Sequence, residues 1–191
     1  PRDDGDKNPA ARIDAGDDVE TAVREGEFGL GASSFTTRSE ESERTDRIDA
    51  KRGLAKSLVR AQKPVQAVKV WQEVLTMPGA TNDDRVSLAE AQIRSNDWAG
   101  AKATLNTVPP THETYDRYRL EAMVADSEKQ WKKADSFYET AAGLTTKPAG
   151  IYNNWGFSKL SRGDAAGAEK LFKEALTYDP TRFTTKNNLV L

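Results

Sequence analysis

The sequence contains no cysteine and a single histidine among its 191 residues. The missing cysteine excludes a disulfide framework, a thiolate zinc site, an iron–sulfur cluster and a cysteine nucleophile in this chain. The one histidine, His112, follows two prolines in a predicted loop, which favours an ordinary surface residue. No glycine-rich phosphate loop and no serine nucleophile motif occur. The sequence therefore predicts neither an enzyme nor a bound metal or other cofactor.

Long apolar runs are also missing, and no stretch approaches the roughly 18 apolar residues that a membrane-spanning helix needs. Charge is divided unevenly: residues 1–47 hold 13 acidic and 7 basic side chains, and residues 48–191 hold 17 and 21. The first segment also has few large apolar side chains, so we predict an acidic, mostly disordered leader with a short helix near residues 19–24. The net charge of +4 over residues 48–191 is too small for a nucleic-acid-binding surface.

Residues 48–191 are organised by a repeat. Four alanines, Ala67, Ala101, Ala134 and Ala168, follow one another at spacings of 34, 33 and 34 residues. A large apolar residue lies four positions after each alanine, and a small residue lies twelve positions before it. Such offsets place residues on one helix face, with small residues where two helices cross closely. The repeat predicts stacked helix pairs in four units, 48–81, 82–114, 115–148 and 149–182, and a truncated fifth unit, 183–191.

Short polar breaks separate the two predicted helices of each unit. They are Gln62-Lys63, Asn96-Asp97, Lys129-Gln130 and Gly163-Asp164, and two of the four contain turn or capping residues. The four tryptophans, Trp71, Trp98, Trp131 and Trp155, fall at regular positions of the repeat. We interpret all four as packing residues and not as the walls of a ligand site.

This pattern resembles the tetratricopeptide (TPR) family. The best match is residues 149–182, which contain the family's Trp155-Gly156 pair, Gly163 in the turn and a closing Asp179-Pro180. The resemblance covers about three quarters of the chain. It implies an all-α fold, a TPR right-handed superhelix (α-solenoid) of stacked antiparallel helix pairs. It also implies a non-enzymatic protein that holds a segment of a protein partner in its concave groove.

In this family the first helix of each unit lines the groove, which implies a set of partner-binding residues. They are Asn153, Asn154, Phe157, Asn187, Asn188, Arg119, Met123, Arg52 and Lys56. TPR relatives use asparagine at the positions matched by Asn154 and Asn188, where its amide donor and acceptor hold a peptide main chain. A different interpretation is that these two asparagines hydrogen-bond neighbouring helices. A further one is that the acidic leader lies across Arg52, Lys56 and Arg119.

Residues 152–191 resemble the last repeats of TadD-type proteins, the TPR lipoproteins of tight-adherence (Flp) pilus machines. The repeated Asn-Asn pairs, the turn rich in small residues and the Asn187-Asn188-Leu189 ending carry this resemblance. It implies a pilotin-like assembly factor for a type IV/Flp (Tad) pilus secretin, at the periplasmic face of the outer membrane. The secretin or another Tad component would be the partner.

Such a lipoprotein contacts the membrane through an acylated cysteine at its mature start, which this sequence does not contain. We therefore expect the anchor to precede Pro1 in a longer protein. Two other interpretations stay open. One is a cytoplasmic TPR cochaperone or regulator that binds a client peptide, and the other is an enzyme whose activity lies in a region beyond Leu191.

Overall fold

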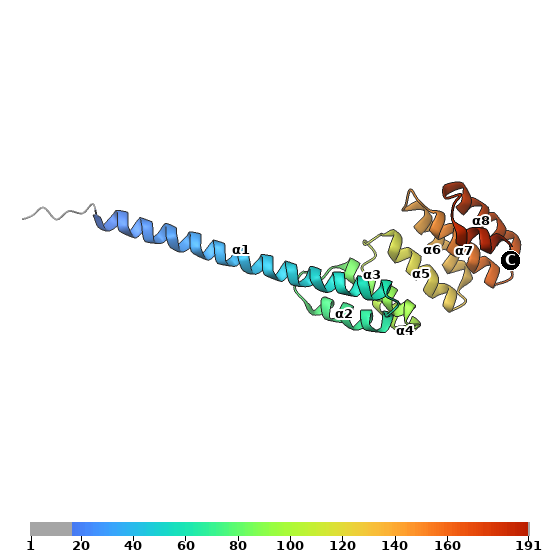
Figure 1. Cartoon of the computed structure of the whole chain (residues 1–191), viewed down its shortest axis with the longest axis horizontal. Helices are drawn as coiled ribbons and strands as arrows, with labels where there is room; N and C mark the ends of the chain where they lie inside the picture. Colours follow the sequence, from blue (N-terminus) through green and yellow to red (C-terminus); the bar gives the residue numbers. More distant parts are fainter. Residues whose placement is uncertain (1–16, 191) are drawn as a thin grey trace, which may run out of the picture. The chain divides into compact units, whose positions relative to one another are not determined.

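The computed structural model describes residues 17–190, with side chains described from residue 37 to residue 189. The chain divides into two units, 1–46 and 47–191. Nine helices and no strand occur among the described residues (Figure 1). The predicted all-α fold class is therefore confirmed. Within the same residues, no helix is both long enough and apolar enough to cross a membrane.

Helix α1 spans Asp17–Arg60, and the remaining helices all lie in the second unit. They are α2 (Pro64–Thr76), α3 (Asn82–Arg94), α4 (Trp98–Asn106), α5 (Tyr115–Ser127), α6 (Trp131–Gly143), α7 (Ala149–Ser161), α8 (Ala165–Tyr178) and α9 (Phe183–Val190). Helices α3, α5, α7 and α9 begin at residues 82, 115, 149 and 183, which are the first residues of the predicted second to fifth repeat units.

The beginning of α1 differs from the leader that the sequence predicts for residues 1–47. Residues 17–47 are helical, whereas the sequence predicts disorder with a short helix near residues 19–24. Residues 1–16 lie outside the described residues. The physical reason lies further along the helix, where the buried Ile48 and Ala55 anchor α1 in the repeat array. A helix nucleated there can extend toward its N-terminus by adding one hydrogen bond per residue.

The turn between the two helices of each repeat has one recurring backbone conformation. The second-to-last residue of each connection is in the left-handed region, at Gln62 (φ 56°), Asn96 (65°), Lys129 (58°) and Gly163 (87°). The residue after each donates its backbone N–H to a carbonyl five positions earlier, as Asp97 does to Gln92 and Asp164 does to Lys159. This is the Schellman arrangement, which ends one helix and lets the next begin antiparallel to it. These positions are the polar breaks that the sequence predicts.

Two of the second helices begin at a capping aspartate. Asp97 accepts a hydrogen bond from the backbone N–H of Gly100, and Asp164 accepts one from Gly167, both at 2.9 Å. Each bond satisfies an N–H group that has no partner within its own helix. Helices α2 and α6 begin after Lys63 and Gln130, whose side chains form no such bond. The predicted capping in two of the four connections is confirmed.

Buried clusters join each repeat to the first helix of the next one. The cluster around Trp71 combines side chains of α1, α2 and α3, and the cluster around Leu105 combines α3, α4 and α5. The cluster around Tyr138 combines α5, α6 and α7. The alanines at the repeat positions, Ala67, Ala101, Ala134 and Ala168, are each at most 1% exposed. A repeat therefore buries its apolar face only with its neighbour, as in other solenoids.

Candidate functional site

The second unit contains a solvent-accessible cavity of about 640 Å³, here called the groove cavity. Its walls come from α5, α7 and α9, the first helices of their repeats, and from α4 and α6. It is lined by Trp98, Met123, Asp126, Ser127, Trp131, Tyr138, Asn153, Asn154, Phe157, Ser158, Ser161, Thr184 and Asn188. The volume lies within the roughly 300–1,000 Å³ that is usual for ligand sites in proteins.

Five of the predicted partner-binding residues line the groove cavity: Asn153, Asn154, Phe157, Asn188 and Met123. Phe157 is 55% exposed, which is a large fraction for an aromatic ring in a folded chain. An apolar ring left in water inside a cavity can be buried by a ligand, with a gain in free energy. The structure therefore brings the C-terminal part of the predicted set together. Asn187 is exposed and lies outside the cavity wall.

The asparagines of the wall connect α7 to α9. Asn153 is 9% exposed, and its Oδ1 atom accepts hydrogen bonds from Thr185 Oγ1 at 2.9 Å and from Asn188 Nδ2 at 3.1 Å. The bond from Asn188 to Asn153 joins two neighbouring helices, as one of the two interpretations of Asn188 predicts. Asn154 Oδ1 lies 3.5 Å from Asn153 Nδ2, a long contact. Among the described residues no acceptor is bonded to Asn154 Nδ2, so this amide group can donate to a ligand.

Asp126 carries the one carboxylate in the wall of the groove cavity. Its two oxygens accept hydrogen bonds from Ser158 Oγ at 2.7 Å and from Tyr138 Oη at 2.8 Å. Burial raises the pKa of Asp126, and the two hydrogen bonds offset this only in part. Tyr138 also has a raised pKa, because its phenol is buried and lies beside Asp126. The carboxylate is thus held in place by neutral donors.

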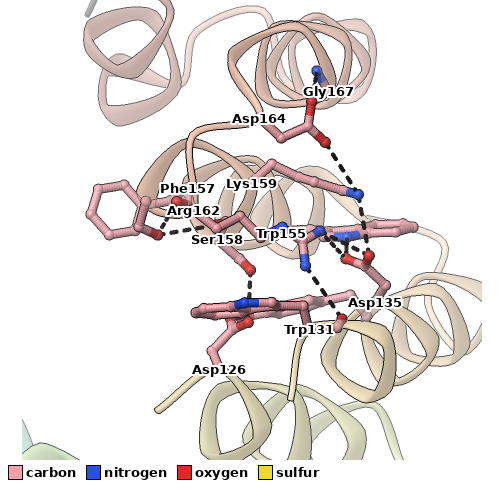
Figure 2. A network of polar contacts seen from close by, with 12 residues as sticks. Asp126, Trp131, Asp135, Trp155, Phe157, Ser158, Lys159, Arg162, Asp164 and Gly167 are labelled. Carbon is pink, nitrogen blue, oxygen red and sulfur yellow. Dashed lines mark hydrogen bonds and ion pairs between the residues drawn. The ribbon is translucent and has the colours of Figure 1, made fainter. Parts of the chain in front are cut away.

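A polar network joins α6 to α7 beside the groove cavity (Figure 2). Asp135 accepts hydrogen bonds from Trp155 Nε1 at 2.6 Å, from Arg162 at 2.6 and 2.8 Å, and from Lys159 at 3.2 Å. Burial favours the neutral form of Asp135, but these bonds outweigh it and lower the pKa. The Arg162 guanidinium also lies 5.7 Å from the ring centroid of Trp131. The network therefore fixes one aromatic wall of the cavity.

The interpretation of all four tryptophans as packing residues is correct for two of them. Trp71 is 2% exposed, and Trp155 stacks on Tyr138 with ring centroids 6.2 Å apart. It is incomplete for Trp98 and Trp131, which are partly exposed and line the groove cavity. Each of the two is the first residue of its helix and follows a left-handed turn residue by two positions. The two tryptophans are 33 residues apart in the sequence. That shared position was a signal in the sequence that could have indicated a common role.

Arg52 and Arg119 lie outside the groove cavity and are paired within the array. Arg52 donates to Asp84 at 2.7 and 2.8 Å, and Arg119 lies 3.0 Å from Asp116. Burial favours the neutral form of Asp84, but hydrogen bonds from Arg52 and Thr81 outweigh it and lower its pKa.

Arg52 and Arg119 are already paired with aspartates, so they would attract the acidic leader less strongly than two unpaired arginines would. Lys56 is exposed on α1. A partner-binding role for Arg52, Lys56 and Arg119 stays a prediction.

A second hollow of about 380 Å³ lies between α3 and α5. It is lined by Asp83, Val86, Ser87, Glu90, Thr114, Tyr115 and Asp116. The Nε2 atom of His112 lies 2.9 Å from Asp83 Oδ1 at the edge of this hollow. No group of three or more histidine, aspartate or glutamate side chains in residues with described side chains is arranged to hold a metal ion.

Comparison with known proteins gives no match to a family model and no match to a curated protein. Solved structures do match. YrrB, a TPR protein with an unusual peptide-binding site, is 14% identical with a TM-score of 0.61, over 75% of this chain and 75% of YrrB.

PilF of Pseudomonas aeruginosa is 15% identical with a TM-score of 0.65, over 76% of this chain and 67% of PilF. MamA is 13% identical with a TM-score of 0.58, over 71% of this chain and 80% of MamA. At these identities the likeness concerns the fold, and the chain has the tetratricopeptide-repeat fold that its sequence pattern predicts.

Proposed function

We propose that this chain is a non-enzymatic interaction scaffold that holds an extended segment of a partner protein in the groove cavity. The observation that carries the proposal is the exposed ring of Phe157 beside the Asn154 amide, in a cavity of about 640 Å³. Burial of an apolar anchor against such a ring supplies affinity. An amide that both donates and accepts hydrogen bonds suits the main chain of a peptide of any sequence.

The composition of the wall supports the same proposal. Trp98, Trp131, Phe157 and Met123 all contribute to the cavity. Aromatic residues and methionine are enriched at protein interfaces, where an aromatic ring buries a large area with few rotatable bonds and methionine adapts its shape to the partner. A peptide ligand also agrees with YrrB, a protein of the same fold that is described as having an unusual peptide-binding site.

Photo-crosslinking in the source organism tests the proposal. A benzoylphenylalanine is placed at position 157 in one strain and at position 139 in a second strain. Glu139 is an exposed residue of α6 outside the cavity wall, so it is a matched surface position. We expect a protein adduct from position 157 that is missing from position 139. The same adducts at both positions, or none at position 157, would contradict a partner in the groove.

We infer further that the partner is a pilus secretin or another Tad component, and that the chain is a pilotin-like lipoprotein at the periplasmic face of the outer membrane. The resemblance of residues 152–191 to TadD-type proteins supports this narrower proposal. Mass spectrometry of the adduct from position 157 tests it. A secretin or another Tad component is the expected partner. A cytoplasmic chaperone or client would contradict the pilus role and favour a cochaperone.

A further inference from the structure

We propose that the partner segment presents a basic side chain, lysine or arginine, to the groove cavity, where Asp126 receives its charge. This inference rests on the proposed function, since it names the chemistry of the segment held there. It is carried by two features of the same cavity wall: a carboxylate with no cationic partner and a set of partly exposed aromatic rings.

The carboxylate of Asp126 has acceptor capacity left for a ligand. An ionised carboxylate offers about four acceptor positions, and Ser158 and Tyr138 are the two donors bonded to Asp126 among the described residues. Both donors are neutral hydroxyl groups, so the negative charge is not balanced by them. A lysine or arginine head group would supply the charge-assisted hydrogen bonds that this carboxylate lacks.

The neighbouring carboxylate of Asp135 has the cationic partners that Asp126 lacks. Asp135 pairs with Arg162 and Lys159, with nitrogen–oxygen distances of 2.6 and 3.2 Å. In the part of the chain with described side chains, no lysine or arginine forms an ion pair with Asp126. Arg162 does lower the pKa of Asp126 through its charge, but Asp135 opposes this effect. An uncompensated and partly buried charge is unfavourable until a ligand balances it.

The aromatic rings suit the remainder of a basic side chain. Trp98, Trp131 and Phe157 line the same cavity as Asp126. The face of an aromatic ring attracts a cation, and a ring also packs against the alkyl stem of lysine or arginine. The chain already shows this contact, because the Arg162 guanidinium lies over the Trp131 ring at 5.7 Å. An acidic segment, in contrast, would bring like charge to Asp126.

Selection from a random peptide library displayed on phage tests the inference. The wild-type chain is the bait, and the Phe157→Ala variant removes peptides that bind elsewhere. A selected peptide is then synthesised twice, once with its basic residue and once with norleucine, which keeps the alkyl stem without the charge. Titration of both peptides against the wild type and against Asp126→Asn forms a double-mutant cycle.

We expect basic residues to be enriched at one position of the selected peptides. Norleucine should weaken binding to the wild type about tenfold, the scale of one charge-assisted contact. The same exchange should have no effect on binding to Asp126→Asn. The matched control is Glu139→Gln, which removes an exposed carboxylate outside the cavity wall and should bind both peptides as the wild type does.

Two results would overturn the inference, and they differ in what they mean for the proposed function. Peptides that require Phe157 but carry no basic residue, or that bind equally with norleucine, would leave the groove function standing. The failure to select any Phe157-dependent peptide would overturn the inference and the groove function together. Asp126→Asn keeps an acceptor oxygen for Ser158 or Tyr138, and thermal unfolding checks that it folds. The norleucine exchange on the wild type does not depend on that variant.

Discussion

Gly156 of α7 lies against the ring of Phe172 of α8, and a β-carbon at Gly156 would stand 2.6 Å from a ring carbon of Phe172. Phe172 is 1% exposed, so its ring has little room to move away. Glycine at this position therefore permits the closest crossing between the two helices of the fourth repeat. The equivalent positions of the other repeats, Ala55, Ala89 and Ala122, are fully buried alanines.

We predict that Gly156→Ala lowers the free energy of unfolding by about 1–3 kcal/mol, because the added methyl group overpacks the crossing. Gly143→Ala is the control. Gly143 is the last residue of α6, and an added β-carbon there meets nothing within 4 Å. That exchange should be neutral or should stabilise the chain by up to about 1 kcal/mol through helix propensity. Urea unfolding measures both, and equal effects would contradict the close crossing.

At a left-handed turn residue we predict a gain in the free energy of unfolding, in contrast to the loss predicted for Gly156→Ala. Lys129 has a φ of 58°, a conformation that strains a residue with a β-carbon. Lys129→Gly should therefore raise the free energy of unfolding by about 1 kcal/mol. Gly163→Ala, at φ 87°, should lower it by about 1–2 kcal/mol. Urea unfolding of the two variants checks this pair, and a loss of stability in Lys129→Gly would argue against the recurring turn.

The lowered pKa values of Asp135 and Asp84 predict that the fold loses stability at low pH. Burial opposes their ionisation, but hydrogen bonds from Trp155 and Arg162, and from Arg52, outweigh it. A lowered folded-state pKa gives stability that is fully present above the unfolded value of about 4, and that is lost as the pH falls through the folded value. We expect this acid loss to be smaller in Asp135→Asn, measured by urea unfolding at a series of pH values. A variant profile parallel to the wild type would contradict this role of Asp135.

Asp126 should change the pH dependence of stability in the direction opposite to Asp135 and Asp84, because burial raises its pKa. Its contribution to stability is present below the unfolded value of about 4 and is lost as the pH rises through the folded value. In the wild type this partly offsets the acid loss due to Asp135. Asp126→Asn should therefore lose stability more steeply on acidification than the wild type. The same pH series measures it, and a shallower loss would show that the carboxylate is not destabilised by its surroundings.

The fold could be predicted because each repeat uses a small set of residue types at fixed spacing. Ala101 and Leu105 sit where the repeat places them, and both are buried. The left-handed residue Asn96 falls in the predicted break. Helix α1 was harder to predict, since the extension of a helix from a buried anchor such as Ile48 leaves no apolar pattern in the extended part.

The candidate site was less predictable, because its contacts depend on side chains far apart in the sequence. The bonds from Arg52 to Asp84, from Ser158 to Asp126 and from Thr185 to Asn153 all join residues 32 positions apart. The repeat indicates that such positions face each other in successive repeats, but not which pair of side chains forms a bond. For the same reason the sequence alone did not show that Arg52 is already paired or that Trp98 and Trp131 share a cavity with Phe157.

The central claim is that the C-terminal groove is the surface that binds a partner. The most direct measurement maps the amide chemical shifts of the isotope-labelled chain during titration with a phage-selected peptide. We predict that the largest changes fall on Met123, Asp126, Asn154, Phe157 and Ser158, which line the groove cavity from α5 and α7. Shifts concentrated instead on exposed residues outside the wall, such as Glu139 and Lys173, would contradict the account.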